Sequence, residues 1–284
     1  MYELIHAGRA TFPIALSCRA LEVSRSGYYR WLGAEPSARA TEDAELAQEI
    51  GVIHHEHKGR YGSPRVHREL RAGGRRVSRK RVARLMRENG LRGRVPRRFR
   101  RTTDSRHSAR IAPNLLERDF SASAPNEVWA GDITYVPTSE GWVYLAVLLD
   151  LFSRRLVGWA MSDQIDTELA LSALEMAVRE RAPKPGLIHH TDRDCRYASD
   201  DYQAALEQHG LVPSMSRKAD CWDNAVAESV FATLEKELLA EEPIKSRAKT
   251  RAEISDYIEN CYNVRRRHSY LDYATPVAYE LGVA

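Results

Sequence analysis

The sequence predicts a mixed α/β domain with a five-stranded sheet, preceded by a basic region that is entirely helical. Apolar residues change from helical spacing to strand-like runs near Glu127. The charge changes sign at nearly the same place: residues 1–118 carry 26 Lys and Arg against 12 Asp and Glu, and residues 119–284 carry 17 against 27. The two parts are therefore +14 and −10, and 284 residues are enough for two domains.

The composition excludes several classes of protein. With 43% hydrophobic and 29% charged residues, the chain is globular rather than disordered. No apolar run approaches the roughly 18 residues of a membrane span, and we find no secretory signal. The four cysteines form no CxxC pair, which argues against a disulfide framework or a cysteine zinc site. We expect a soluble protein of the reducing cytosol, with no membrane partner.

The basic region contains three stretches with helical spacing: residues 43–57, a helix that starts at Ser63–Pro64, and residues 78–88. In the last, Ser78 can cap the first turn while basic side chains face outward: Arg79, Lys80, Arg81, Arg84 and Arg87. Lys58–Arg101 holds 18 basic residues and two acidic ones. This density predicts double-stranded DNA as the partner, with helix 78–88 in the major groove; a solvated charged face is the alternative.

We divide the chain into four parts on these patterns. Residues 1–38 are a small helical segment in which Ala20–Trp31 is either a second helix-turn-helix or an aromatic core. Residues 39–92 are a helix-turn-helix-like DNA-binding domain. Residues 93–121 are a basic linker whose Arg97 and Arg98 are expected to follow the DNA backbone. Residues 122–284 are the α/β domain with a C-terminal helix.

In the α/β domain, β-branched and aromatic runs separated by turns predict three antiparallel strands, followed by alternating helices and strands. The expected strands are residues 128–136, 142–149, 155–161, 187–190 and 212–215. The expected helices are residues 167–181, 199–209, 225–239 and 250–265.

Three acidic residues are the candidate site. Asp132 interrupts a strand that is otherwise apolar, Asp192 follows the end of the fourth strand, and Glu228 lies in the first turns of the helix that Asp223 or Asn224 can cap. Burying an ionised acid is costly unless it is paired or binds a metal. Oxygen ligands without cysteine suit Mg²⁺, or Mn²⁺ as a substitute. A surface acid or a strand-end ion pair is the alternative for each residue alone.

Three motifs resemble the DDE transposases of bacterial insertion sequences of the IS-three family, specifically their OrfB product. They are Trp129–Tyr135, His190–Arg193, and Ser216–Lys218 with Cys221–Ser229. Tyr61–Val66, and Tyr262–Ser269 with Leu271 and Pro276, are similar to the same family, so the resemblance spans nearly the whole chain.

The resemblance implies a ribonuclease H-like core, shared with retroviral integrases, in which Asp132, Asp192 and Glu228 bind two Mg²⁺ ions. It further implies hydrolytic cleavage at the element's ends, followed by joining of the 3′-OH to a new phosphodiester without a covalent enzyme intermediate. His189 and His190 are then strand-end or DNA-proximal residues rather than catalytic bases. Further DNA contacts are expected from basic residues in or near the motifs: Arg65, Arg217, Lys218, Lys236, Arg266 and His268.

The chain departs from the family pattern at several positions. Asp194 stands where the family more often has a glycine or a small or amide residue, and we expect it to affect the metal site or the turn. Glu235, with Lys236 beside it, replaces a lysine that commonly faces DNA. His54, His55 and His57 lack cysteine partners, so we predict no zinc.

The resemblance also concerns partners and alternatives. No sustained heptad precedes Ser78, so the chain resembles the OrfB portion alone and is expected to need the first-reading-frame (OrfA) product as partner or fusion. A homo-oligomer on DNA in the bacterial cytoplasm, at the nucleoid, is expected. The alternatives to a strand transferase are an inactive DNA-binding regulator of transposition and a ribonuclease H-type nuclease that does not join strands.

Overall fold

The computed structural model describes residues 1–35, 37–94, 111–217, 221–239 and 245–282. The chain divides into two compact units. Residues 1–59 and 69–92 form a helical unit, and residues 60–68 together with 93–284 form the unit that contains the sheet. Each unit is described by itself.

The first helices of the helical unit enclose a small aromatic core. They are α1 (Tyr2–Ala7), α2 (Ile14–Ala20) and α3 (Arg25–Leu32). The Ser24 side chain caps α3 by accepting from the Gly27 N–H at 3.0 Å. Tyr28 is fully buried and its ring packs edge-on against Tyr2. The aromatic residues predicted in this segment therefore form a core.

The basic helices form where the sequence predicts them. They are α4 (Ala38–Glu56), α5 (Ser63–Ala72) and α6 (Arg79–Glu88). α4 begins five residues earlier than expected because Ser37 accepts the Ala40 N–H and caps it. Ser78 caps α6 as predicted. Leu46 and Ile50 of α4 are buried, as are Val82, Leu85 and Met86 of α6.

The predicted mixed sheet is confirmed. Within the described residues, five strands form one sheet in the order β3-β2-β1-β4-β5. β1 pairs antiparallel with β2, and β2 with β3, whereas β1 and β4, and β4 and β5, are parallel. The strands are β1 (Val128–Thr138), β2 (Gly141–Asp150), β3 (Leu156–Ser162), β4 (Ile188–Thr191) and β5 (Val212–Met215).

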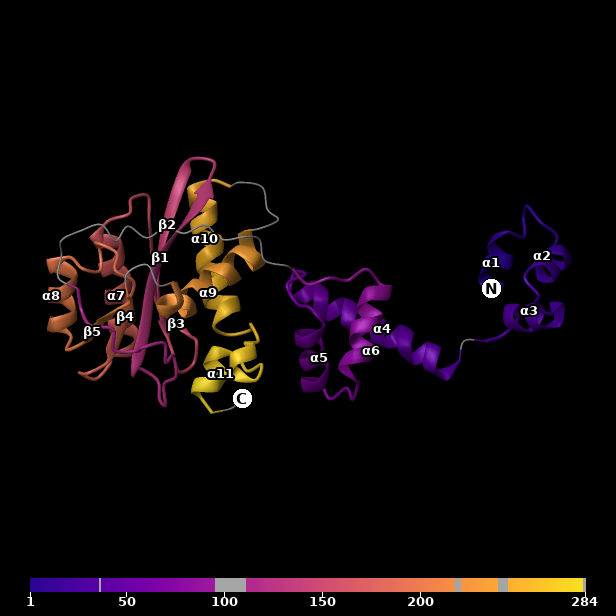
Figure 1. Ribbon diagram of the computed structural model, residues 1–284, viewed down its shortest axis with the longest axis horizontal. Helices are drawn as coiled ribbons and strands as arrows, with labels where there is room; N and C mark the ends of the chain where they lie inside the picture. The colour runs from indigo at the N-terminus through magenta and orange to yellow at the C-terminus, as the bar shows by residue number, and fades with distance from the viewer. Residues whose placement is uncertain (36, 95–110, 218–220, 240–244, 283–284) are drawn as a thin grey trace. The chain divides into compact units, whose positions relative to one another are not determined.

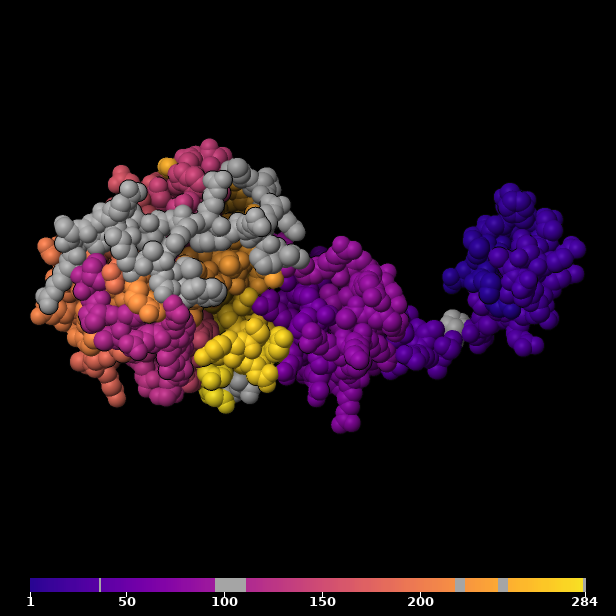
Figure 2. All heavy atoms as spheres, viewed as in Figure 1, coloured from indigo at the N-terminus to yellow at the C-terminus, as the bar shows by residue number. Residues whose placement is uncertain are grey.

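Helices cover both faces of the sheet (Figure 1). One face packs on α9 (Ala225–Leu234) and α10 (Arg247–Asp256), and the other on α7 (Thr167–Arg181) and α8 (Asp200–Gln208). Because side chains alternate along a strand, Val128 and Ala130 of β1 join the α9 cluster while Trp129 and Ile133 join the α7 cluster. In the space-filling view, the C-terminal residues, in yellow, form part of the surface of the sheet-containing unit (Figure 2).

The packing of β3 on α7 depends on a glycine. A Cβ atom at Gly158 would lie 2.3 Å from the Ala173 carbonyl oxygen, so a larger residue would push the helix away. α7 starts where Asp166 caps it by accepting the Leu169 N–H at 3.0 Å.

Two of the expected helices change geometry before they end. α9 becomes π-helical at Glu235–Leu239, and α10 continues as a π-helical segment, Tyr257–Tyr262. The extra residue in such a turn shifts which side chains face inward. Here Glu237 is buried, although helical spacing gave no sign of it. A short helix, α11 (Pro276–Glu280), follows near the C-terminus.

None of the helices among the described residues is long and apolar enough to cross a membrane.

Candidate active site

Asp132 lies in the middle of β1 and faces α9. Its neighbour Ala130 belongs to the α9 cluster, and residues two apart on a strand share a face. The side chain is half-buried, and its Oδ1 accepts the Ile133 N–H at 2.9 Å. The strand thus directs this carboxylate toward the helix that carries Glu228.

Asp192 follows β4 directly and matches Asp132 in position. The parallel register pairs Ala130 with His190, so each acid comes two residues after a paired residue. The same alternation places both acids on the α9 side of the sheet. Oδ1 of Asp192 accepts the Asp194 N–H at 3.1 Å, which closes the turn after β4.

Glu228 lies in the first turn of α9 and is half-buried, whereas Ala227 and Phe231 of the same helix are buried in the core. Asn224 occupies the N-cap position, but neither it nor Asp223 makes the predicted capping hydrogen bond. Asn224 instead donates from Nδ2 to the Gly131 carbonyl at 3.5 Å. This contact holds the start of α9 beside the residue that precedes Asp132.

The three acids interact electrostatically. Burial, then the charge of Asp192, and then the charges of Glu228 and Asp194 raise the pKa of Asp132 well above its usual value. The charges of Asp192 and Glu228 therefore lie close enough to Asp132 to repel its ionised carboxylate. A divalent cation between them would remove that repulsion, and oxygen ligands are the set that Mg²⁺ prefers.

Among the described residues, no three His, Cys, Asp or Glu side chains are grouped closely enough to hold a metal. The donor chemistry of the three predicted acids, carboxylate oxygens without cysteine, nevertheless fits Mg²⁺.

His190 connects the strand of Asp192 to the start of α9. Ser214 Oγ accepts the Leu115 N–H at 2.9 Å, so its own hydrogen is available to His190 Nδ1 at 2.8 Å. The other ring nitrogen, Nε2, lies 2.8 Å from the Asp223 carbonyl oxygen and must donate to it. His190 is therefore neutral with its proton on Nε2, consistent with burial that lowers its pKa.

Asp223 holds the segment before α9 in place. Its carboxylate is fully buried and accepts from Arg217 Nε and Nη2, both at 2.9 Å, and from Arg118 Nε at 3.2 Å. These hydrogen bonds, the one from Arg217 foremost, lower the pKa of Asp223. Arg217, predicted to contact DNA, thus has an internal partner while about half of its side chain stays exposed.

His189 and His190 agree with the strand-end interpretation, since both lie in β4 and are buried. His189 faces α8, and its Nε2 lies 2.8 Å from the Tyr202 hydroxyl. Burial lowers the pKa of His189 to about 3, so the ring is neutral. A Cβ atom at Gly131 would lie 2.9 Å from this ring, which explains the glycine beside Asp132.

Asp194, the departure from the family pattern, points into the turn. It is buried, forms an ion pair with Arg196 and accepts the Arg196 N–H at 3.0 Å. Its charge still contributes to the raised pKa of Asp132.

The basic residues predicted to contact DNA differ in their surroundings. Arg79 and Lys80 are exposed on α6, whereas Arg81 and Arg84 each bond Asp43 at 2.6 Å. Lys236 is half-buried. Three of the predicted positions lie outside the described residues: Arg97, Arg98 and Lys218.

Arg65, Arg266 and His268 come together inside the sheet-containing unit. Arg266 Nε and Arg65 Nη1 donate to Glu237 Oε1 at 3.0 and 2.9 Å, and the Tyr257 hydroxyl donates to Oε2 at 2.8 Å. Burial by itself would raise the pKa of Glu237, but the charges of Arg266 and Arg65 outweigh it and lower the value.

Sequence reasoning missed the roles of Glu237, Asp223 and Arg154. Glu237 becomes internal only through the π-helical turn, and Asp223 was interpreted as a helix cap. Arg154 follows Ser153 in a turn, where nothing distinguishes it from the neighbouring Arg155.

Models of known families match most of the chain. An integrase core domain matches residues 122–221, a second integrase core domain model matches residues 209–276, and an HTH-like domain matches residues 41–99. These matches indicate DNA binding and an enzyme of the transposase and integrase class.

Full-length relatives agree with these models. The chain is 45% identical to the 31 kDa protein of insertion element IS600 from Shigella sonnei, over 92% of this chain and 96% of that protein. It is 42% identical to the transposase InsF of insertion sequence IS3A from Escherichia coli K12, over 98% of both. A solved HTLV-2 integrase catalytic core in complex with magnesium aligns at 17% identity and a TM-score of 0.44, over 56% of this chain and 99% of that one. The chain belongs to the family of IS3 insertion-sequence transposases, whose function is DNA transposition.

Proposed function

We propose that Asp132, Asp192 and Glu228 form the catalytic site of a DDE strand transferase and hold two Mg²⁺ ions, for which Mn²⁺ can substitute. The observation that carries this proposal is the mutual electrostatic interaction of three acids on one face of the sheet. Paired divalent ions in such a site activate the attacking oxygen and stabilise the leaving oxygen.

The three acids would bind the metal ions, and neighbouring residues hold the elements that carry these acids together. Asp132 and Asp192 bind from the two central parallel strands, and Glu228 binds from the first turn of α9. His190 and Asn224 keep the strand and the helix together, through the Asp223 and Gly131 carbonyl oxygens. No side chain serves as a nucleophile. Water breaks the phosphodiester and leaves a 3′-OH, which then attacks a second phosphodiester while the old 3′ oxygen departs with the proton.

DNA binding is proposed for the exposed Arg79 and Lys80 first, because they have the most accessible charges of the predicted set on α6. An element has two ends, so we propose that a homo-oligomer holds both. The OrfA product is proposed as partner or fusion. The nucleoid is the proposed place of action, because the substrate is DNA.

The test is a joining assay with labelled DNA from the element's ends, Mg²⁺ and, in parallel, the OrfA product. Wild type is compared with Asp132→Asn, Asp192→Asn and Glu228→Gln, and with Asp200→Asn as a control acid outside the site. We expect all three site variants to lose cleavage and joining while they still bind DNA. Joining that survives any of them contradicts the assignment. Binding by wild type without cleavage would indicate a regulator, and cleavage without joining a nuclease.

A further inference from the structure

Arg154 is a buried cation for which the part of the chain that the structure describes provides no anionic partner. Only 7% of the residue is exposed, and its guanidinium makes one hydrogen bond, from Nη2 to the Phe120 carbonyl at 3.1 Å. Nε and Nη1 are buried and have no hydrogen-bond partner. Among the residues that the structure describes, no acid forms an ion pair with it.

Such an arrangement is costly. A guanidinium keeps its charge at all accessible pH values, and burying an unpaired charge costs several kcal/mol. A neutral residue at this position would avoid that cost. An unpartnered buried arginine therefore indicates an anion that binds from outside the chain.

The fold holds Arg154 firmly in place. It lies in the turn between β2 and β3 with φ at +59°, a left-handed conformation that non-glycine residues seldom adopt. Asp150 shapes this turn: its carboxylate accepts the Phe152 N–H at 2.9 Å, and its carbonyl accepts the Arg154 N–H at 2.8 Å. The turn is built to present this side chain.

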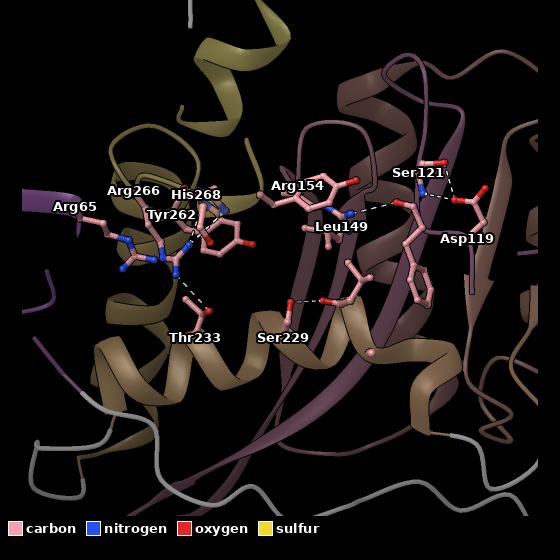
Figure 3. A pocket seen from close by; sticks show the side chains of 15 residues that line it. Arg65, Asp119, Ser121, Leu149, Arg154, Ser229, Thr233, Tyr262, Arg266 and His268 are labelled. Atoms are coloured by element: carbon pink, nitrogen blue, oxygen red, sulfur yellow. Dashed lines mark hydrogen bonds between the residues drawn. The ribbon is translucent and has the colours of Figure 1, made fainter. Parts of the chain in front are cut away.

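Arg154 lines a cavity of about 620 Å³, which we call the Arg154 cavity. Figure 3 shows Arg154 and Arg266 beside this cavity, with Ser229 of α9 along it. The cavity also reaches Ala225 and Val226 in the first turn of α9, whose N-terminus has no side-chain cap. Tyr270 covers the guanidinium with its ring 3.9 Å from Cζ, although 61% of this tyrosine is exposed.

The charges that face the cavity favour an anion with a single charge. Arg65 and Arg266 share Glu237, and Asp119 accepts hydrogen bonds from Ser121 at 3.0 and 2.6 Å. The three lining arginines therefore outnumber these two acids by one. His268 adds no charge because burial, foremost, lowers its pKa well below the usual value.

We propose that the Arg154 cavity binds one phosphodiester group of the DNA substrate, with the Arg154 guanidinium donating to its two non-bridging oxygens. The inference rests on the proposed function, which brings DNA to α9. A phosphodiester carries one negative charge, and the planar guanidinium matches its oxygens. The positive end of the α9 helix dipole, beside Ala225 and Val226, favours an anion there. Tyr270 moves aside when the phosphate enters. Ser229 follows Glu228 directly, so the bound phosphate lies along the helix that carries the proposed catalytic acid.

The experiment measures binding of the full chain to duplex DNA from the element's ends, with a neutral methylphosphonate placed at each phosphate in turn. For the wild-type protein, neutralising some of the phosphates should weaken DNA binding, and the phosphate held by Arg154 should be one of them. Arg154→Met should bind natural DNA roughly tenfold more weakly, with a salt slope reduced by about one, and should be insensitive at that one position. The matched control is Arg155→Met, because Arg155 is next in the turn but already bonds Glu280 at 2.8 Å. This control should keep the wild-type pattern.

A second variant keeps the inference testable even if Arg154→Met fails to fold. Tyr270→Cys changes an exposed residue, and its thiol should exchange with an activated disulfide tether on the same phosphate, releasing the tether's leaving-group thiol and forming a protein–DNA disulfide above the wild-type background. An unchanged interference pattern in folded Arg154→Met, or crosslinks scattered along the DNA, overturns the inference. The joining assay runs in parallel. If joining persists while these results fail, only the cavity assignment is wrong; if the phosphate contact is found without joining, the proposed function fails alone.

Discussion

Asp132 and Asp192 lie at matching positions along two adjacent parallel strands, each two residues beyond the pair Ala130 and His190. The match follows from register: parallel neighbours keep the same alternation, so both carboxylates face α9. Fifty-nine residues of chain separate them, yet the sheet makes them neighbours.

Neutralising Asp132 should stabilise the protein in the absence of metal. Folding raises the pKa of Asp132, so the free energy of unfolding of the protein falls as pH rises from the unfolded pKa toward the folded pKa of this acid. Above both pKa values, the folded protein is destabilised by the whole cost of keeping this carboxylate ionised. At pH 7, Asp132→Asn removes this penalty, so its melting temperature without metal should exceed that of wild type. Mg²⁺ should then raise the wild-type value and leave the variant unchanged. A lower melting temperature for the metal-free variant would contradict the repulsion.

His190 should affect metal binding beyond its effect on stability. His190→Phe removes the hydrogen bond to the Asp223 carbonyl that fixes α9 relative to β4. Mn²⁺ affinity should fall roughly tenfold, with kcat reduced more than the KM for DNA changes. His190→Gln, which keeps a donor, should recover part of the affinity. His189→Phe, on the opposite face of the same strand, is the control: it should lower stability yet keep Mn²⁺ affinity. If His190→Phe and His189→Phe lose equal Mn²⁺ affinity, His190 contributes only packing.

Stability should fall as pH drops below about 6.5, in part because of His189. This ring stays neutral in the folded protein because burial lowers its pKa to about 3, whereas the unfolded chain protonates near 6.5. Protons then favour the unfolded state between these values, by about 2 kcal/mol at pH 5. Denaturant unfolding at pH 7 and pH 5 measures the difference. In His189→Gln, the difference in unfolding free energy between pH 7 and pH 5 should be smaller than in wild type by about 2 kcal/mol. An unchanged difference would show that another group is responsible.

Glu237→Gln should be strongly destabilising. The substitution leaves the buried Arg266 without its charge partner, and breaking a buried pair from one side costs roughly 3–5 kcal/mol. Chemical denaturation of the full chain measures this cost. Glu235→Gln, in the same π-helical turn but half-buried, serves as control and should change stability by less than about 1 kcal/mol. Similar values for the two variants would show that the Arg266 contact contributes little.

Periodicity was enough to predict the five strands and most helices of the sheet-containing domain, and local motifs singled out the three acids as the candidate site. The strand 128–136 is recognisable by its apolar run, and Asp132 is conspicuous because it interrupts that run. What could not be predicted depends on long-range contacts. Glu237 turns inward because Arg65 and Arg266, distant in sequence, meet it there. His190 is a buried connector because Ser214 and the Asp223 carbonyl converge on its two nitrogens.

The charge pattern predicted a DNA partner but not which arginines are accessible. Arg81 and Arg84 are ion-paired on α6, whereas Arg79 and Lys80 are exposed, and the sequence treats all four alike. Side-chain pairing across helices decides this difference, and helical spacing within one helix does not report it.

The most direct test of the shared metal site is anomalous X-ray scattering from crystals of the full chain soaked in Mn²⁺. The account predicts two peaks, each within coordination distance of carboxylate oxygens from the set Asp132, Asp192 and Glu228, and their loss in Asp132→Asn. Peaks elsewhere, with the three carboxylates turned to separate arginines, would contradict it.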